Sequence, residues 1–309
     1  MIKGEWRGIL LKEEKNRWIL KARLKPCPTI HNLKFIIQNF LRFSPLTSSP
    51  FYLSLHLLVS HFTLYNTIMN YIKEYQKMKN YNWWFLARND IIEKMLKKYS
   101  SSSNFYDQKI LDCGCGRGAL LIYLKKKGFK NLYGIDNNKD MIKNIDDISV
   151  FNMDVCNMSF NDEEFDIVIS SDLLEHIDDD KKAILEMKRV LKKNGVLIVF
   201  VPAFNFLWSY HDVINMHKRR YTKKEIVFKL KSEGFEILKS SYWNFLAFFP
   251  VFIIRMIKKI FKIRTNDFYS FPLFLNKIIA YFIFVENFLL NYINFPFGVS
   301  VFVVARKGG

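Results

Sequence analysis

Short apolar runs alternate with amphipathic segments over most of the chain. The runs predict seven strands, at Lys109–Cys113, Asn131–Ile135, Val150–Met153, Phe165–Ser170, Val196–Val201, Phe235–Tyr242 and Val299–Ala305. Helical spacing lies between them, at Ala119–Lys127, Lys139–Ile145, Asp179–Leu191 and from a capping box at Thr222 and Glu225 to about Gly234. Nearly continuous apolar strands that alternate with helices predict an α/β fold with a doubly wound, mostly parallel sheet covered on both faces.

Three segments lie outside this alternation. Tyr71–Tyr99 has apolar residues at helical spacing and predicts an entry helix. Residues 243–298 are rich in Phe, Ile and Leu and too long for a bare connection, so we expect two helices, around 246–263 and 272–293. Residues 1–68 carry proline breaks and no motif, and they are treated as an extension of a main domain at 69–309. Three interpretations of that extension stay open: an accessory domain, a membrane-proximal leader, or sequence upstream of a later start at Met69.

Composition and charge narrow the class of protein. Half of the 309 residues are hydrophobic, which excludes a wholly disordered chain. Four cysteines are too few for a disulfide scaffold and favour a reducing compartment, and Cys113 and Cys115 have no companion ligands at metal-site spacing. The 47 basic residues against 29 acidic ones favour a polyanionic neighbour, either nucleic acid or an anionic membrane. No secretory signal is visible, and Phe51–Ile72 carries too many polar residues to be preferred as a membrane span.

The sharpest local signal is the run ILDCGCGRGA at 110–119, where a predicted strand meets a predicted helix through three alternate glycines. Glycine permits positive φ and close approach of a ligand to the backbone, and the helix start beyond it leaves N–H donors free. Asp136 ends the next strand, where a carboxylate can accept both hydroxyls of a ribose, and Asp154 follows the third strand. The run therefore predicts a nucleoside-binding site.

The glycine spacing alone leaves the cofactor open, because it also satisfies the dinucleotide fingerprint with Asp136 about 20 residues on. Asp112 favours an adenosine cofactor without phosphate, since a carboxylate in the glycine loop repels pyrophosphate but suits an amino-acid ammonium group.

Further motifs from Tyr71 to Lys307 together resemble a class I S-adenosylmethionine-dependent methyltransferase of the type 11 group. They are LDCGCGRGALL (111–121), GID (134–136), NMDV (152–155), FDIVISSDLLEHI (165–177) and MKRVLKKNGVLIVFVPA (187–203). A narrower subgroup, often found in settings of cell-surface polysaccharide or lipid-linked glycan synthesis, is similar at YNWWFLARNDII (81–92), LWSYHD (207–212), KRRYT (218–222) and PFGVSVFVVARK (296–307). The resemblance implies a Rossmann-like sheet with an antiparallel last strand. The chain departs from the pattern at Cys113, where an aliphatic residue is usual.

The resemblance also implies roles for individual residues. Asp112 and the 114–118 backbone would hold the methionine end of the cofactor, Asp136 the ribose and Asp154 the adenine amino group. Trp84 and Arg88 would close over the site. The implied cofactor contacts are Trp84, Arg88, Asp112, Gly114, Cys115, Gly116, Gly118, Asp136, Asn137, Asp154, Val155, Ser170 and Ser171.

Residues after the fourth and fifth strands lie at the carboxyl-end rim of the predicted sheet, where ligands bind in open α/β folds. A sulfonium cofactor carries an activated methyl group, so the protein must align an acceptor, exclude water and provide a base where the acceptor needs one. His176, His211 and Asp212 are the candidate catalytic residues, and Arg219, Arg220 and Tyr221 are the candidate substrate contacts. Packing or surface roles stay open for each.

The expected activity is methyl transfer to oxygen or nitrogen of a small or lipid-linked acceptor, with carbon left open. Apolar residues beside Arg255, Lys258 and Lys259 suit a helix in an anionic membrane interface, so residues 245–293 predict membrane contact, with a helical cap or homodimer interface as the alternative. We expect a cytoplasmic protein, peripheral at the inner face of the membrane. An RNA or protein methyltransferase, an NAD-dependent enzyme and a non-catalytic membrane adaptor stay as alternatives, although no nucleic-acid-binding appendage is apparent.

Overall fold

The chain divides into two compact units, Met1–Asn66 and Thr67–Gly309. The computed structural model describes residues 9–14, 17–22, 83–100, 104–142, 144–265, 267 and 273–308. In the first unit, β1 (Ile9–Glu14) pairs antiparallel with β2 (Arg17–Ala22), a hairpin that the sequence pattern did not predict. The segment Phe51–Ile72 and the part of the entry helix before residue 83 lie outside the described residues.

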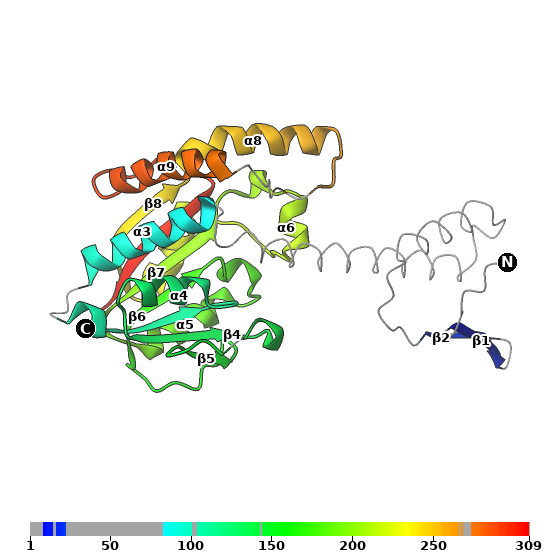
Figure 1. The fold of residues 1–309 in the computed structure, drawn as a ribbon, viewed down its shortest axis with the longest axis horizontal. Coiled ribbons are helices and arrows are strands. Elements are labelled where there is room, and N and C mark those ends of the chain that lie inside the picture. Colours follow the sequence, from blue (N-terminus) through cyan, green and yellow to red (C-terminus); the bar gives the residue numbers. More distant parts are fainter. Residues whose placement is uncertain are drawn as a thin grey trace. The chain divides into compact units, whose positions relative to one another are not determined.

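The second unit is built on a seven-stranded sheet with the strand order β5-β4-β3-β6-β7-β9-β8 (Figure 1). Its strands are β3 (Lys109–Cys113), β4 (Asn131–Asp136), β5 (Ser149–Asn152), β6 (Phe165–Ser171), β7 (Leu191–Pro202), β8 (Phe235–Trp243) and β9 (Ser300–Lys307). The first five are parallel, and β9 runs antiparallel to β7 and β8. The predicted doubly wound sheet with an antiparallel last strand is confirmed.

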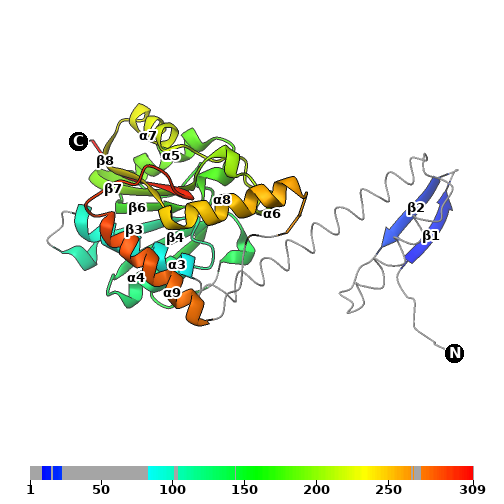
Figure 2. The same ribbon diagram turned by 90° about the horizontal axis from the view of Figure 1, so that it is seen from above.

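Helices cover both faces of this sheet because its strands are apolar on both sides. Alternate residues of β3 enter different cores, with Leu111 and Cys113 in one and Ile110 in the other. The first core packs against α5 (Asp180–Val190) and α7 (Lys223–Ser232). The second packs against α3 (Trp83–Tyr99), α4 (Ala119–Lys126) and α9 (Leu273–Leu289), which lie on the same side of the sheet in Figure 2.

Short elements occupy the loops at the carboxyl ends of the strands and elsewhere. They are η1 (Phe105–Asp107), η2 (Lys139–Met141), η3 (Leu174–His176), η4 (Asn205–Leu207) and α6 (Tyr210–Ile214). The capping box expected at Thr222 and Glu225 is present at the start of α7. A second one, Ser209 with Asp212, begins α6.

Two local predictions are wrong. The residues that the structure describes between 139 and 145 form only the single 3-10 turn η2 (Lys139–Met141), and Ile145 lies in an isolated bridge with Ile148 instead of a helix. The strand predicted at Val196–Val201 begins earlier, since β7 starts at Leu191 and residues 191–195 belong to it. A register shift between β6 and β7, with Asn194 at φ 60°, accommodates those residues inside the strand.

The insertion before β9 contains two helices, as predicted: α8 (Phe245–Ile260) and α9. The Glu286 side chain of α9 accepts hydrogen bonds from the N–H groups of Phe245 (3.0 Å) and Leu246 (3.2 Å) at the start of α8. A carboxylate there satisfies two helix-terminal donors and complements the helix dipole. Within the described part of the chain, every helix is too short or too polar to cross a membrane.

Candidate cofactor and acceptor site

The loop after β3 adopts a conformation that requires glycine. Gly114, Gly116 and Gly118 have φ values of 75°, 54° and 72°. A Cβ on Gly114 would lie 2.9 Å from Leu173 Cδ1. The N–H groups of Gly114 and Cys115 both donate to the Ile135 carbonyl at 2.9 Å, which ties the loop to the end of β4.

Asp136 lies at the end of β4 and supports the same loop. Its Oδ2 accepts from the Gly116 N–H and its Oδ1 from the Asn138 N–H, both at 2.9 Å. A carboxylate offers about four acceptor positions, so this one keeps capacity for two hydroxyl groups. Asp136 can therefore hold the loop and a ribose at once.

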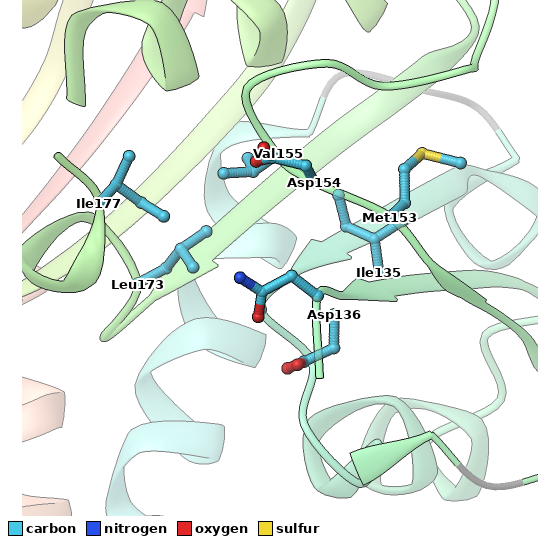
Figure 3. A pocket seen from close by; sticks show the side chains of 9 residues that line it. Ile135, Asp136, Met153, Asp154, Val155, Leu173 and Ile177 are labelled. Carbon is cyan, nitrogen blue, oxygen red and sulfur yellow. The ribbon is translucent and has the colours of Figure 1, made fainter. Parts of the chain in front are cut away.

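A hollow beside Asp136 has an apolar lining and two carboxylates (Figure 3). Met153, Val155, Leu173 and Ile177 form its sides, and Asp154 lies at its edge with Oδ1 accepting from the Cys156 N–H at 2.9 Å. A flat apolar slot with one acceptor at its edge suits a purine that carries an amino group. The predicted residues Asp154 and Val155 lie here.

The hollow continues into a cavity of about 1110 Å³ that shares Gly114, Asp136 and Asn137 with it. The lining of this cavity includes most of the other predicted cofactor contacts, namely Trp84, Arg88, Asp112, Cys115, Gly116 and Ser171. Two predicted contacts do not line it. Gly118 packs beside Ile145 at the start of α4, and Ser170 is fully buried, with no hydrogen-bond partner for its hydroxyl among the described residues.

The entry helix α3 covers one side of the cavity. Arg88 forms an ion pair with Asp172, the residue that follows β6, and its guanidinium lies 5.8 Å from the centre of the Trp84 ring. Asp172 has φ 52°, which turns the chain sharply at the end of β6. The pair fixes α3 to the rim of the sheet.

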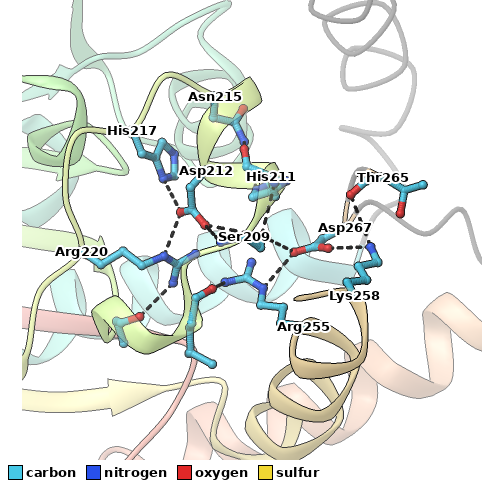
Figure 4. A network of polar contacts seen from close by, with 12 residues as sticks. Ser209, His211, Asp212, Asn215, His217, Arg220, Arg255, Lys258, Thr265 and Asp267 are labelled. Atoms are coloured by element: carbon cyan, nitrogen blue, oxygen red, sulfur yellow. Dashed lines mark hydrogen bonds and ion pairs between the residues drawn. The ribbon is translucent and has the colours of Figure 1, made fainter. Parts of the chain in front are cut away.

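Among the predicted catalytic and substrate residues, His176, His211 and Arg220 line the cavity. Asp212 does not. It is fully buried and accepts from His217 Nδ1 (2.9 Å), Arg220 Nε (2.8 Å) and the Ser209 N–H (2.8 Å), as Figure 4 shows. Burial alone would raise the pKa of this carboxyl, but its bonds to His217 and the nearby Arg220 and Arg255 guanidinium groups hold it well below its usual value. Asp212 stays ionised and positions two residues that do face the cavity.

Arg219 and Tyr221 lie away from the cavity. Tyr221 is buried and donates to Asp180 Oδ2 at 2.8 Å, while Arg219 donates to the Asp178 carbonyl at 2.8 Å and pairs with Asp180. Both stabilise the loop before α7, so the structure gives them a packing role, and Arg220 is the one of the three predicted substrate contacts that lines the cavity.

Two residues that the sequence pattern did not single out face the cavity beside His176. They are Glu175 and His217, and each of the three offers a ligand atom within 4.8 Å of the others. Burial raises the pKa of Glu175 well above its usual value. Burial, together with the adjacent His217, lowers the pKa of His176 to about 4. The sequence places Glu175 in the loop after the fourth predicted strand, but only the fold shows that its carboxyl group is buried.

The far wall of the cavity is apolar and comes from the insertion. Its residues are Leu246, Ala247, Pro250, Val251 and Ile254 of α8 with Ile279, Phe282 and Ile283 of α9. Two arginines interrupt it. Arg255 Nε pairs with Asp267 at 2.8 Å and its Nη1 donates to the Leu207 carbonyl, and Arg220 lies close enough for the two charges to interact (Figure 4).

The donor set fits S-adenosylmethionine. Three acids follow one another along a continuous hollow. Asp112 suits an ammonium group, Asp136 suits a ribose, and Asp154 lies at the edge of an apolar slot. The Asp112 carboxylate, at the end of β3 beside the glycine loop, would repel a pyrophosphate but suits an ammonium group.

The comparisons with known proteins agree with the fold. Residues 111–199 match the family described as "Methyltransferase domain". An uncharacterized protein of Methanocaldococcus jannaschii is 28% identical over 218 residues, which cover 66% of this chain and 94% of that protein. The ubiquinone/menaquinone biosynthesis C-methyltransferase UbiE of Campylobacter jejuni is 26% identical over 176 residues, 45% of this chain and 75% of the relative.

Among solved structures, a chain of the complex between the Haloferax volcanii Trm112 methyltransferase activator and the putative methyltransferase covers 76% of this chain and 93% of its own length. It has a TM-score of 0.51 at 16% identity, a likeness of fold. Residues 111–199 therefore form a methyltransferase domain, and the chain is an S-adenosylmethionine-dependent methyltransferase with the class I fold and S-adenosylmethionine as its cofactor.

Proposed function

We propose that this enzyme methylates oxygen or nitrogen on the polar head of a lipid-linked acceptor, at the surface of an anionic membrane. The observation that carries this proposal is that α8 and α9 separate the cavity from an exposed apolar surface. The same two helices supply the apolar wall of the cavity and, on their outer sides, large apolar side chains open to solvent.

The outer surface is too apolar for an ordinary solvent-exposed face. On α8, Phe249, Ile253 and Ile260 expose 56%, 53% and 73% of their surface. On and just after α9, the exposed apolar side chains include Phe274, Ile278, Tyr281, Phe288 and Tyr292. Contiguous apolar patches of this kind mark interaction surfaces.

Basic residues border this patch and favour a lipid occupant. Lys259, Lys262, Arg264 and Lys277 are exposed at or near the ends of the two helices. Apolar side chains that enter the interface and lysines that meet anionic headgroups are the two parts of interfacial binding. A protein partner or a second copy of the chain would be recognised by concentration-dependent association without vesicles.

In this proposal the residues that line the cavity have separate roles in methyl transfer. S-adenosylmethionine supplies an activated methyl group. The glycine loop, Asp136 and Asp154 fix its position, and Trp84 and Arg88 cover it. The α8–α9 wall receives the lipid tail and excludes water.

The polar end of the acceptor would meet His176, His211 and the two arginines, Arg220 and Arg255. Paired arginines suit a phosphate or carboxylate on the acceptor because guanidinium groups bind such anions with directed hydrogen bonds. Asp212 acts through His217 and Arg220 as a positioning residue.

The test supplies the purified chain with methyl-labelled S-adenosylmethionine and, separately, lipid, RNA, protein and small-molecule fractions of the source cell. We expect label in the lipid fraction. Label confined to RNA, to protein or to water-soluble small molecules would replace the proposed acceptor class.

A double variant, Ile257→Glu with Ile260→Glu, tests the membrane step. We expect it to lose pelleting with anionic vesicles and most lipid methylation, while it still binds S-adenosylhomocysteine. Phe228→Glu is the matched control, because Phe228 is 72% exposed on α7, which packs on the opposite face of the sheet. Equal vesicle binding by the double variant and this control would contradict the assignment of the surface.

A further inference from the structure

Glu175, His176 and His217 form a compact group of metal-ligating side chains at the cavity wall. Glu175 and His176 belong to η3, after β6, and His217 follows α6. One carboxylate oxygen and one nitrogen from each ring lie within 4.8 Å of one another. All three residues line the cavity, so a ligand bound among them would be open to the acceptor.

The Glu175 carboxyl group lacks the partners that a buried acid needs. Glu175 is fully buried, and neither of its oxygens has a hydrogen-bond partner among the residues that the structure describes. A buried carboxylate without compensation is costly, so such a group calls for a specific explanation. A cation held between Glu175 and the two rings would supply the missing interaction.

Each of the two histidine rings has one polar partner outside the group. His217 Nδ1 is bonded to Asp212 Oδ1 at 2.9 Å, and the His176 ring bonds to the backbone of Met216. Metal-binding histidines commonly donate one ring N–H to a carboxylate or carbonyl, which leaves the other nitrogen free for the metal. The Lys218 N–H donates to the Glu175 carbonyl at 2.8 Å, which joins the two segments that carry the ligands.

The nearby cationic side chains do not occupy the Glu175 carboxyl group. Two guanidinium groups interact with Glu175 through space, but each is paired with another acid, Arg88 with Asp172 and Arg220 with Asp212. The Glu175 oxygens are therefore available to a metal cation, which would bind them in place of a proton.

We propose that Glu175, His176 and His217 bind a divalent transition-metal cation, with zinc as the fitting example, and that the open side of the cation faces the acceptor. Two histidines and a carboxylate with a free position are the ligand set of catalytic zinc sites, where bonds measure about 2.0–2.2 Å, so the three side chains close in slightly on binding. A hydroxyl group that binds to such a cation loses its proton more readily.

The proposal goes beyond the lipid-linked acceptor, and its test needs no acceptor. The full chain is stripped with a chelator and dialysed against Zn²⁺, and bound metal is measured. Co²⁺ in place of Zn²⁺ gives a visible absorption spectrum that reports nitrogen and oxygen ligands. We expect one Zn²⁺ per chain and at least a tenfold loss of affinity in Glu175→Gln and in His217→Gln.

His211→Gln is the matched control, because His211 lines the same cavity outside the group and should leave metal binding unchanged. Binding of S-adenosylhomocysteine certifies that each variant is folded, and the two ligand variants serve as replacements for each other if one fails this check. Folded wild-type chain without stoichiometric Zn²⁺ or Co²⁺ would overturn the proposal. Equal Zn²⁺ affinity in a folded ligand variant and the wild type would overturn it as well.

Discussion

Replacing Asp212 with asparagine should destabilise the second unit strongly, because the substitution leaves a buried guanidinium without its counter-charge. Asp212 is fully buried, Arg220 is 4% exposed, and their Oδ1 and Nε atoms lie 2.8 Å apart. Burial lowers the pKa of Arg220 only to about 10, so the guanidinium keeps its charge at neutral pH. Asparagine would also place an amide N–H near donors that now share the carboxylate.

The magnitude follows from the burial of both partners. Removing one member of a buried ion pair costs about 3–5 kcal/mol. For a unit of this size each kcal/mol lowers the melting temperature by about 2–4 °C, so the expected decrease is about 6–20 °C.

Asp178→Asn is the control for the loss of one acidic charge in the same region. The Asp178 side chain is 88% exposed and pairs with Lys218 at 2.5 Å. An exposed pair of this kind contributes at most about 1 kcal/mol, so its melting temperature should fall by less than about 4 °C. Thermal unfolding followed by circular dichroism compares the three proteins. Similar small decreases in both variants would refute the argument from burial.

Three further results are expected. Asp136→Asn should raise the Kd for S-adenosylhomocysteine by about 10- to 100-fold in calorimetry, since charged hydrogen bonds contribute about 1.5–3 kcal/mol, whereas Asp140→Asn on η2 should leave the Kd unchanged. Gly114→Ala should weaken the same binding, because φ 75° costs an L residue about 1–2 kcal/mol, and unaltered calorimetry would contradict this. Burial alone would raise the pKa of Glu93, but hydrogen bonds from two lysines and a tyrosine lower it from 4.5 to about 2. The stabilising contribution of the Glu93 carboxylate is therefore present above pH 4.5 and disappears as the pH falls toward 2. The difference in urea midpoint between wild type and Glu93→Gln should therefore shrink between pH 6 and pH 3, and a constant difference would disprove the linkage.

The sheet and the positions of Asp136 and Asp154 at its edge could be predicted from sequence, because both depend on local order along the chain. Each strand is a continuous apolar run, and a residue that follows a parallel strand must lie at the carboxyl edge of the sheet. Asp136 and Asp154 are placed by this rule without further information.

The acceptor side could be predicted only in outline because burial and side-chain direction decide it. Arg220 faces the cavity while its neighbours Arg219 and Tyr221 pack against Asp180, a division that the motif KRRYT does not reveal. His217 is a candidate residue because Asp212 holds its ring and because Glu175, 42 positions earlier in the chain, lies close to it. Contacts between separate loops are set by the fold as a whole.

One buried carboxylate couples the two helices of the insertion mechanically. The Glu286 side chain of α9 accepts hydrogen bonds from the first turn of α8, and that turn contributes Leu246 to the cavity wall. The position of α9 therefore helps to fix the first turn of α8 and, with it, one part of the cavity wall.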